Sequence, residues 1–349
     1  MKAVKKSLFI SVSLFCIVSL TSCESGGRTL PSANGSIYEM LVVMDKSVWE
    51  SAAGDSVKAY MGADMPCLPQ MEPYFNVSQV SSQLFDDFLK PTRNILYADI
   101  NPNRYTQNKV KYKTNVYSQP QAVCVVQSPS AEEFAVCFEE QKDAIRQWFV
   151  QQEIVRQGRF YRNYKTTDTR EAVQCRFGCD ICIPADYLLV RDNADFVWCV
   201  NDGGSLRRDL VIWSYPYTDE GQLTEEALLS KRNEVLGRNI GGQLEGSHIG
   251  TEYKHFPPQY NAINVNGRWC AEVRGLWKML DGEAMGGPFV QHTRIDELGG
   301  RVITAEVFIF APGQKKRNPL RQAEAILYTL RLPQEINQLE EVEVGNKKE

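Results

Sequence analysis

The stretch from Asn261 to Ala311 constrains the fold most, because three turn signals divide it into four apolar-rich segments. The turn signals are Asn266-Gly267, Asp281-Gly282 and Gly299-Gly300. An Asn-Gly pair tolerates the positive φ angles that a two-residue β-hairpin requires. This hairpin would pair residues 263–265 with residues 268–270. We therefore expect an antiparallel meander here.

Side chains in this meander would alternate between two faces. In the second segment one face is largely apolar and the other is charged. The apolar face carries Trp269, Ala271, Val273, Trp277 and Met279, and the charged face carries Arg268, Glu272, Arg274 and Lys278. The last segment, residues 303–310, is apolar on both faces, which is typical of a central strand covered on both sides.

Amphipathic helices follow runs of strands in both halves of the chain. Ser130 and Glu133 form a capping box before an apolar stripe that ends near Gly158. A second helix is predicted from Thr224 to Ile240, and a third begins with Asn318 as its cap and Pro319 in its first turn. Shorter helices are predicted at 45–60 and 83–90. Strands are predicted at 37–44, 93–100, 121–127, 173–184, 187–191, 196–201 and 210–215.

This order of elements predicts an α+β fold, in which antiparallel sheets carry amphipathic helices packed on one face. The folded length suits two similar layered subdomains, residues 37–165 and residues 166–332, the second containing the meander. Residues 333–349 are polar and strongly charged, so we expect them to form a loose tail.

The first 22 residues have the pattern of an export signal. Lys2, Lys5 and Lys6 precede an apolar segment, residues 8–20, which is shorter than the about 20 residues that a membrane-spanning helix needs. The segment ends in Leu20-Thr21-Ser22-Cys23, which resembles the lipobox of bacterial lipoproteins. The resemblance implies that Cys23 is the lipidation site and the first residue of the mature chain. Residues 23–36 would then form a flexible tether.

Charge excludes one class of partner. Removal of residues 1–22 takes away three lysines and no acid, so the formal net charge changes from −4 to −7. Nucleic-acid binding requires a basic face, so we expect no nucleic-acid partner. The acyl anchor would provide the attachment to the membrane.

Cys16 leaves with the signal and Cys23 would carry lipid, so eight other cysteines remain, an even number that permits disulfide bonds in an exported protein. Cys175, Cys179 and Cys182 are spaced like metal ligands. A strand over residues 173–184 would hold the first two about 13 Å apart and point the third to the other face, so we expect no metal there. Four other cysteines lie within apolar segments, where they would act as small core residues: Cys124, Cys137, Cys199 and Cys270.

The segment Met285-Gly286-Gly287-Pro288-Phe289 interrupts the strand pattern of the meander. Glycine and proline in a strand indicate a bulge or a close approach of another backbone. With neighbouring residues this segment would line a small-molecule or peptide cleft. The candidate site residues are Glu272, Arg274, Trp277, Gly286, Gly287, Phe289, His292 and Arg294. The alternative, which we favour, is that Gly-Gly-Pro bends the sheet and the charges lie on its solvated face.

The lipobox, Ile183-Pro184-x-x-Tyr187, Arg274-Gly275-Leu276-Trp277 and the 285–289 segment together resemble an uncharacterised lipoprotein family of the Bacteroidetes, domain of unknown function 4837. The resemblance implies an outer-membrane lipoprotein of the cell envelope that faces the periplasm, and it brings no catalytic residue. The order of elements over residues 173–240 is also similar to that of Mog1/PsbP-like domains.

These features predict a lipid-anchored, non-catalytic binding or assembly factor with an envelope protein as its partner and no cofactor. The sequence has neither an H-E-x-x-H nor a G-x-S-x-G motif. One alternative is an envelope hydrolase with an unfamiliar site near Glu272, His292 and Arg294. Another is redox or metal chemistry at Cys175, Cys179 and Cys182.

Overall fold

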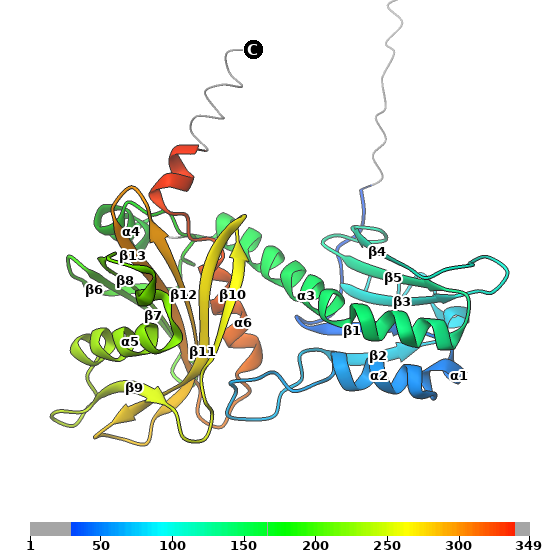
Figure 1. The fold of residues 1–349 in the computed structure, drawn as a ribbon, viewed down its shortest axis with the longest axis horizontal. Coiled ribbons are helices and arrows are strands. Elements are labelled where there is room, and N and C mark those ends of the chain that lie inside the picture. Colours follow the sequence, from blue (N-terminus) through cyan, green and yellow to red (C-terminus); the bar gives the residue numbers. More distant parts are fainter. Residues whose placement is uncertain (1–28, 166, 339–349) are drawn as a thin grey trace, which may run out of the picture.

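The computed structural model describes residues 29–165 and 167–338, which form two lobes joined by a long helix (Figure 1). Each lobe contains one β-sheet. Three regions assigned from sequence lie outside the described residues: the export signal, Cys23 with the start of the tether, and the end of the charged tail.

The first lobe is built on a five-stranded sheet with the order β2-β1-β3-β5-β4. Its strands are β1 (Glu39–Val43), β2 (Asn76–Val80), β3 (Asn94–Ile100), β4 (Lys109–Thr114) and β5 (Ala122–Ser128). The sheet is mixed, because β1 runs parallel to β2 and β3, and β3 runs parallel to β5. Only β4 pairs in the antiparallel sense.

Helices cover one face of this sheet, as predicted. They are α1 (Lys46–Trp49), α2 (Ala52–Met61) and α3 (Ala131–Asn163). Ser130 caps α3 by accepting a hydrogen bond from the backbone N–H of Glu133. The opposite face is covered by a loop that contains the 3-10 turn η1 (Ser82–Leu84), where the sequence pattern predicted a longer helix.

The second lobe contains an eight-stranded sheet that is antiparallel throughout. The order is β10-β11-β12-β13-β8-β7-β6, and β9 also pairs with β11. The strands are β6 (Leu188–Asp192), β7 (Phe196–Asp202), β8 (Arg207–Pro216), β9 (His248–Glu252), β10 (Gln259–Val265), β11 (Arg268–Leu280), β12 (Gly286–Asp296) and β13 (Arg301–Phe310).

The predicted meander is confirmed as the run from β10 to β13. Val265 pairs with Arg268 across a turn in which Asn266 and Gly267 both have positive φ angles, 54° and 81°. Strand β13 is central, as its two apolar faces predicted, because it lies between β12 and β8.

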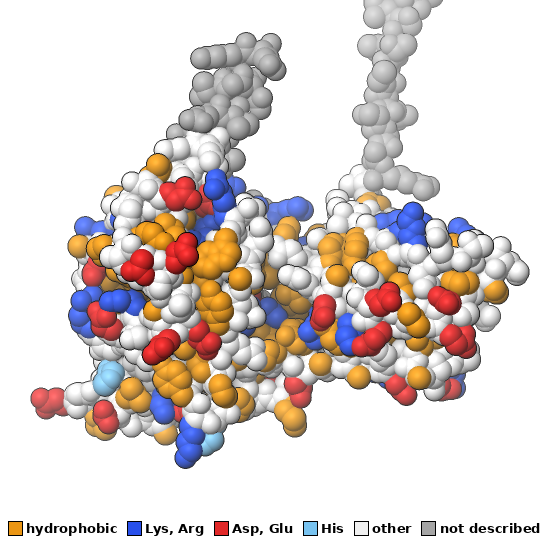
Figure 2. Space-filling view, viewed as in Figure 1, with side chains coloured by type: hydrophobic (Ala, Val, Ile, Leu, Met, Phe, Trp, Pro, Cys, Tyr) orange, Lys and Arg blue, Asp and Glu red, His pale blue; other side chains and the backbone are white. Residues whose placement is uncertain are grey.

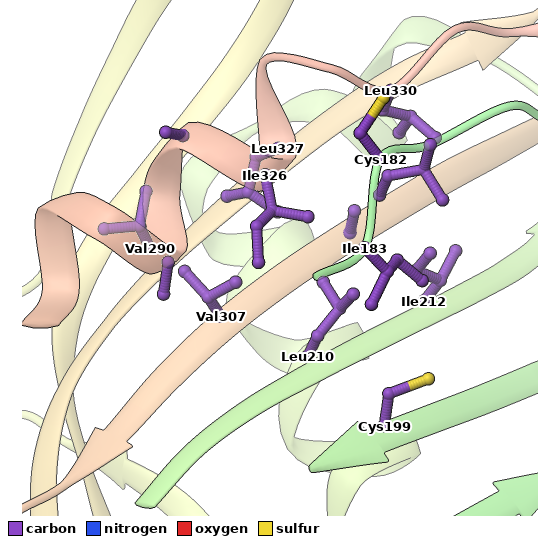
Figure 3. Packing of buried hydrophobic residues seen from close by; sticks show 14 of the residues in the cluster. Cys182, Ile183, Cys199, Leu210, Ile212, Val290, Val307, Ile326, Leu327 and Leu330 are labelled. Carbon is purple, nitrogen blue, oxygen red and sulfur yellow. The ribbon is translucent and has the colours of Figure 1, made fainter. Parts of the chain in front are cut away.

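Helices cover both faces of the second sheet, which differs from the predicted one-sided packing. Helix α5 (Glu225–Asn239), which follows the 3-10 turn η2 (Glu220–Leu223), packs on one face. Helices α4 (Asp168–Phe177) and α6 (Arg317–Leu327) pack on the other. The α+β class itself is confirmed. Figure 3 shows Cys182 and Cys199 among the aliphatic side chains of the face that α6 covers.

The strand predicted over residues 173–184 is wrong, because its first half is helix α4. The buried residues of α4 are Thr169, Ala172, Val173 and Phe177, which recur at helical spacing. Gly178 ends the helix in the left-handed conformation that glycine adopts readily. The apolar run after it, Cys179 to Ile183, is buried without joining the sheet.

The C-terminal part of the chain also differs from the prediction. Helix α6 begins at Arg317, and its cap is the distant carboxylate of Glu72, which accepts hydrogen bonds from the N–H groups of Lys316 (2.6 Å) and Arg317 (3.2 Å). Residues 333–338, predicted as loose, are helical, and Glu335 is buried. None of the described helices is both long and apolar enough to span a membrane.

Candidate functional site

The sheet of the second lobe divides the predicted site residues between its two faces. Glu272 lies directly opposite His292 in the pairing of β11 with β12. Since residues alternate along a strand, Glu272, Arg274, His292 and Arg294 all point toward α6. Trp277 and Phe289 point toward α5. The structure therefore does not bring the eight residues together into one cleft.

The charges on the α6 face are buried, which contradicts the prediction of a solvated face. Arg274 donates two hydrogen bonds of 2.8 Å to Glu272 and also bonds to Glu324 of α6. Glu324 in turn accepts two hydrogen bonds from Arg321, at 2.9 and 3.1 Å. The sequence pattern missed this arrangement because the second carboxylate comes from a helix about 50 residues further along the chain.

This set of four charges, Glu272, Arg274, Arg321 and Glu324, alters the acidity of its carboxyl groups. Burial alone would raise the pKa of Glu272, but Arg274 and the adjacent His292 more than offset it and hold that pKa well below its usual value. For Glu324, the effect of burial is likewise outweighed by Arg274 and Arg321, so its pKa is lowered. Both carboxylates are therefore held in the ionised state.

His292 lies beside this cluster and is covered by α6 and the residues after it. Its Nε2 atom is 3.5 Å from Glu272, and its ring packs edge-on against Tyr328. Only 2% of the His292 side chain and 4% of Glu272 are exposed. Arg294 is held by Glu335 (2.8 Å) and by the carbonyl oxygen of Leu330 (2.6 Å). A substrate has no access to the imidazole and carboxylate at this depth.

On the opposite face, Phe289 is part of the core beneath α5. The guanidinium of Arg232, on α5, lies 3.8 Å from the centre of the Phe289 ring. Arg232 also forms a two-bond ion pair with Glu306 of β13, and neither side chain is exposed to solvent. Phe289 is thus a structural residue whose ring packs against the buried guanidinium of Arg232.

Gly287 is required for packing, and it opens no cleft. A Cβ atom at this position would lie 1.9 Å from the carbonyl oxygen of Ile309, the same oxygen that accepts a hydrogen bond from Trp277 (3.0 Å). The close backbone approach that glycine in a strand indicates is therefore present.

We expect Gly287→Ala to lower the free energy of unfolding by about 1–3 kcal/mol or more, because the methyl group forces β12 and β13 apart. Urea denaturation measures this loss. Gly241→Ala is the control, since a Cβ atom there meets its nearest neighbour, the carbonyl oxygen of Ser247, at 3.5 Å. That variant should change stability by less than about 1 kcal/mol. Equal effects in the two variants would contradict the packing role of Gly287.

A pocket of about 240 Å³ lies beside Trp277, at the C-terminal end of α5. Met285, the first residue of the Met-Gly-Gly-Pro-Phe segment, lines it together with Met279. Besides Trp277, the aromatic residues that line the pocket are Trp198, Phe308 and Phe310. Of these lining residues, only Trp277 was predicted from the sequence to be a site residue. Trp198 lies on β7, and nothing local to it indicated that it would share a pocket with β11.

One ion pair forms the polar wall of this pocket. Asp209 accepts hydrogen bonds from the indole N–H of Trp198 (2.8 Å) and from Arg207 (2.9 to 3.2 Å). Burial raises the pKa of Asp209 above its usual value, although both partners stabilise the carboxylate. The pocket thus combines a largely apolar lining with one fixed pair of charges, which is the composition of a binding site.

The cysteine cluster predicted as a weak metal candidate does not form a ligand set. Cys175 is exposed on α4, whereas Cys179 and Cys182 are buried after it. Within residues 29–165 and 167–338, no group of three His, Cys, Asp or Glu side chains is placed to hold a metal ion. The eight cysteines of this part of the chain are free, and seven of them are buried. Cys124, Cys137, Cys199 and Cys270 are core residues, as predicted.

Comparison with known families finds two matches, one for each lobe. Residues 33–162 match the family described as "Domain of unknown function (DUF8532)", and residues 166–329 match "Domain of unknown function (DUF4837)". These matches relate the chain to uncharacterised families of unknown function. No curated protein matches the chain.

Several solved structures are similar to part of the chain, and three of them are the following. Cyanobacterial PsbP (CyanoP) from Synechocystis sp. PCC 6803 has 9% identity and a TM-score of 0.30, over 48% of this chain and 90% of its own. The Ran-binding protein Mog1p of Saccharomyces cerevisiae has 8% identity and a TM-score of 0.28, over 44% and 90%. The lipid transfer and protein localization domain of human StarD13 has 9% identity and a TM-score of 0.22, over 41% and 88%.

Proposed function

We propose that the protein is a lipid-anchored, non-catalytic binding or assembly factor of the cell envelope, which recognises a protein partner through the pocket beside Trp277. The pocket is the observation that carries this proposal. Its volume of about 240 Å³ is below the range of about 300–1,000 Å³ that is usual for small-molecule sites. A cavity of this size suits one anchoring side chain of a partner protein, because such anchors are aromatic or aliphatic groups that fill desolvated pockets.

The membrane location in this proposal depends on the sequence of the first 23 residues. The lipobox would attach Cys23 to the outer membrane on its periplasmic side, and residues 24–36 would connect the anchor to the folded lobes. The formal net charge of −7 expected for the chain without residues 1–22 is consistent with attachment through acyl chains rather than through electrostatic attraction to anionic lipid.

The alternative of a hydrolase near Glu272, His292 and Arg294 has less support. A general acid or base must lie within hydrogen-bond reach of its substrate. All three side chains are instead buried under α6 and its C-terminal extension, and Glu272 and Arg294 are bound in ion pairs. No observation on the described residues favours this alternative over a binding role.

The proposal is tested by purifying the full-length protein from its native membrane in mild detergent. A partner should co-purify in stoichiometric amount with the wild type. Met285→Asp places a charge in the apolar pocket, so the amount of partner should fall by about tenfold or more. Leu244→Asp is the matched control, because Leu244 is an exposed neighbour that does not line the pocket.

Two results would overturn the proposal. One is a protein that purifies alone under conditions that retain its anchor. The other is a partner whose amount is unaffected by Met285→Asp or is equally affected by Leu244→Asp. Cys23→Ala tests the anchor separately, since this variant should leave the membrane fraction without any change in the folded lobes.

A further inference from the structure

A second hollow lies at the other end of α5, on the same face of the sheet. Its volume is about 650 Å³, which is within the range of ligand-binding sites. Tyr217, Tyr260 and Trp269 form its aromatic walls, and Glu220 and Glu225 contribute carboxylates. Tyr260 lies on β10 and Trp269 at the start of β11, while Tyr217 directly follows β8 and donates its backbone N–H to the carbonyl oxygen of Gly300, so the sheet fixes their relative positions.

The aromatic walls of this groove are accessible. Trp269 is on the apolar face of β11 predicted from sequence, but α5 does not extend over it, and 45% of its surface is exposed. Tyr217 and Tyr260 are half-buried beside it. Three aromatic side chains therefore line this open groove, and ammonium and guanidinium groups are attracted to the faces of aromatic rings.

The charges around the groove are acidic. Glu220 and Glu225 are both exposed, and Asp219 and Glu226 adjoin them in sequence. Three of the nearest basic residues along the chain are held in ion pairs: Lys231 with Glu234, Arg294 with Glu335, and Arg301 with Asp296. Arg268 donates to the amide oxygen of Gln338, and its position next to Trp269 on β11 places it on the other face of the sheet. Figure 2 shows acidic side chains bordering hydrophobic ones on the lobe that contains the eight-stranded sheet.

The start of α5 does not reverse this charge. A helix N-terminus carries partial positive charge, which would favour an anion. Here Thr224 caps the helix by accepting a hydrogen bond from the N–H of Ala227, and two glutamates already occupy the first turn. The ligand that this groove favours is therefore a cation.

We propose that this groove binds the side chain of a lysine or arginine in a basic polypeptide segment. The hollow is larger than one side chain requires. It is lined in part by Tyr260 of β10, an edge strand that pairs only with β11 among the described strands. An extended segment can lie along this edge and place one cationic side chain against Trp269, between the two carboxylates. The site is separate from the pocket beside Trp277 and does not depend on the function proposed for that pocket.

The test uses the full-length protein in detergent and three blocked five-residue peptides with lysine, arginine or Nε-acetyl-lysine at the centre. Binding is followed by NMR through the indole N–H signal of Trp269, which Trp269→Phe identifies by its loss. The two charged peptides should shift this signal saturably. The acetylated peptide has the same length but lacks the charge, so its affinity should be lower by about tenfold or more.

Paired variants identify the carboxylates. Glu220→Gln with Glu225→Gln should weaken the binding of the lysine peptide by about tenfold or more, because both charges are removed and the shape of the groove is kept. Glu226→Gln removes a neighbouring carboxylate from the same helical turn, and it should alter binding by less than about twofold. Thermal unfolding of each variant establishes that the second lobe is intact.

Three outcomes would overturn the inference. The first is that the acetylated peptide binds as tightly as the lysine peptide. The second is that no peptide produces a saturable shift. The third is that Glu226→Gln weakens binding as much as the double variant does. A titration with choline is the fourth arm. A shift produced by choline and by neither charged peptide would show a site for a small quaternary ammonium ligand and would reject the polypeptide partner.

Discussion

Replacement of Arg232 with methionine is expected to lower the free energy of unfolding by about 3–5 kcal/mol, because it leaves the carboxylate of Glu306 buried without its partner. Arg232 donates hydrogen bonds to both carboxylate oxygens of Glu306 and a third, of 2.9 Å, to the hydroxyl of Thr251. It also packs against Phe289. Urea denaturation at neutral pH measures the loss in the unfolding transition of the second lobe.

Two further variants separate the ion pair from general effects. Arg232→Met combined with Glu306→Leu should recover most of the lost stability, since apolar replacement of a whole buried ion pair is often close to neutral. Lys231→Met changes the adjacent residue on α5, whose pairing with Glu234 is at the surface. It should change stability by less than about 1 kcal/mol. If Lys231→Met had the larger effect, the assigned role of the buried pair would be wrong.

Glu324→Gln is expected to have an effect of similar size, about 3–5 kcal/mol. Glu324 is the carboxylate through which α6 binds the sheet. Without its charge Arg321 would lose the carboxylate with which it pairs, and Arg274 would keep only its ion pair with Glu272. Glu297→Gln, in the exposed turn between β12 and β13, is the control and should be within about 0.5 kcal/mol of the wild type.

Acid should reduce the difference between Glu324→Gln and the wild type. The pKa of Glu324 is lowered on folding by Arg274 and Arg321, so its contribution to stability is fully present above the unfolded value of 4.5, declines as the pH falls below 4.5, and is lost completely only below the folded-state pKa. Denaturation curves recorded between about pH 6 and pH 3 should therefore converge. Curves that stay parallel over this interval would show that the charge of Glu324 is not what stabilises α6.

Local patterns in the sequence predicted much of the second lobe. The Asn266-Gly267 turn set the register of β10 with β11, and the two apolar faces of β13 placed it in the centre of the sheet. Both signals are contained in a few adjacent residues, where backbone geometry and burial act directly. The Ser130 cap predicted the start of α3 for the same reason.

The candidate site was less predictable, because its residues depend on distant partners. Whether Glu272 and Arg274 face water or a helix is decided by α6, and no pattern near β11 contains that information. The pocket beside Trp277 likewise combines β7, β8, β11 and β13. In α4 the apolar spacing suited a helix, but the apolar run after Gly178, with Cys179, Ile181, Cys182 and Ile183, indicated a strand.

The capping of α6 by Glu72 has a consequence for the order in which the protein is made. Synthesis proceeds from the N-terminus, so the first lobe emerges before α6 and the loop that carries Glu72 is present when α6 forms. Arg317 then bonds to the carbonyl oxygen of Pro73, and Tyr161 of α3 donates to that of Gln322. The first lobe thus serves as an intramolecular template for the last helix, although the families matched by the two lobes divide the chain between residues 162 and 166.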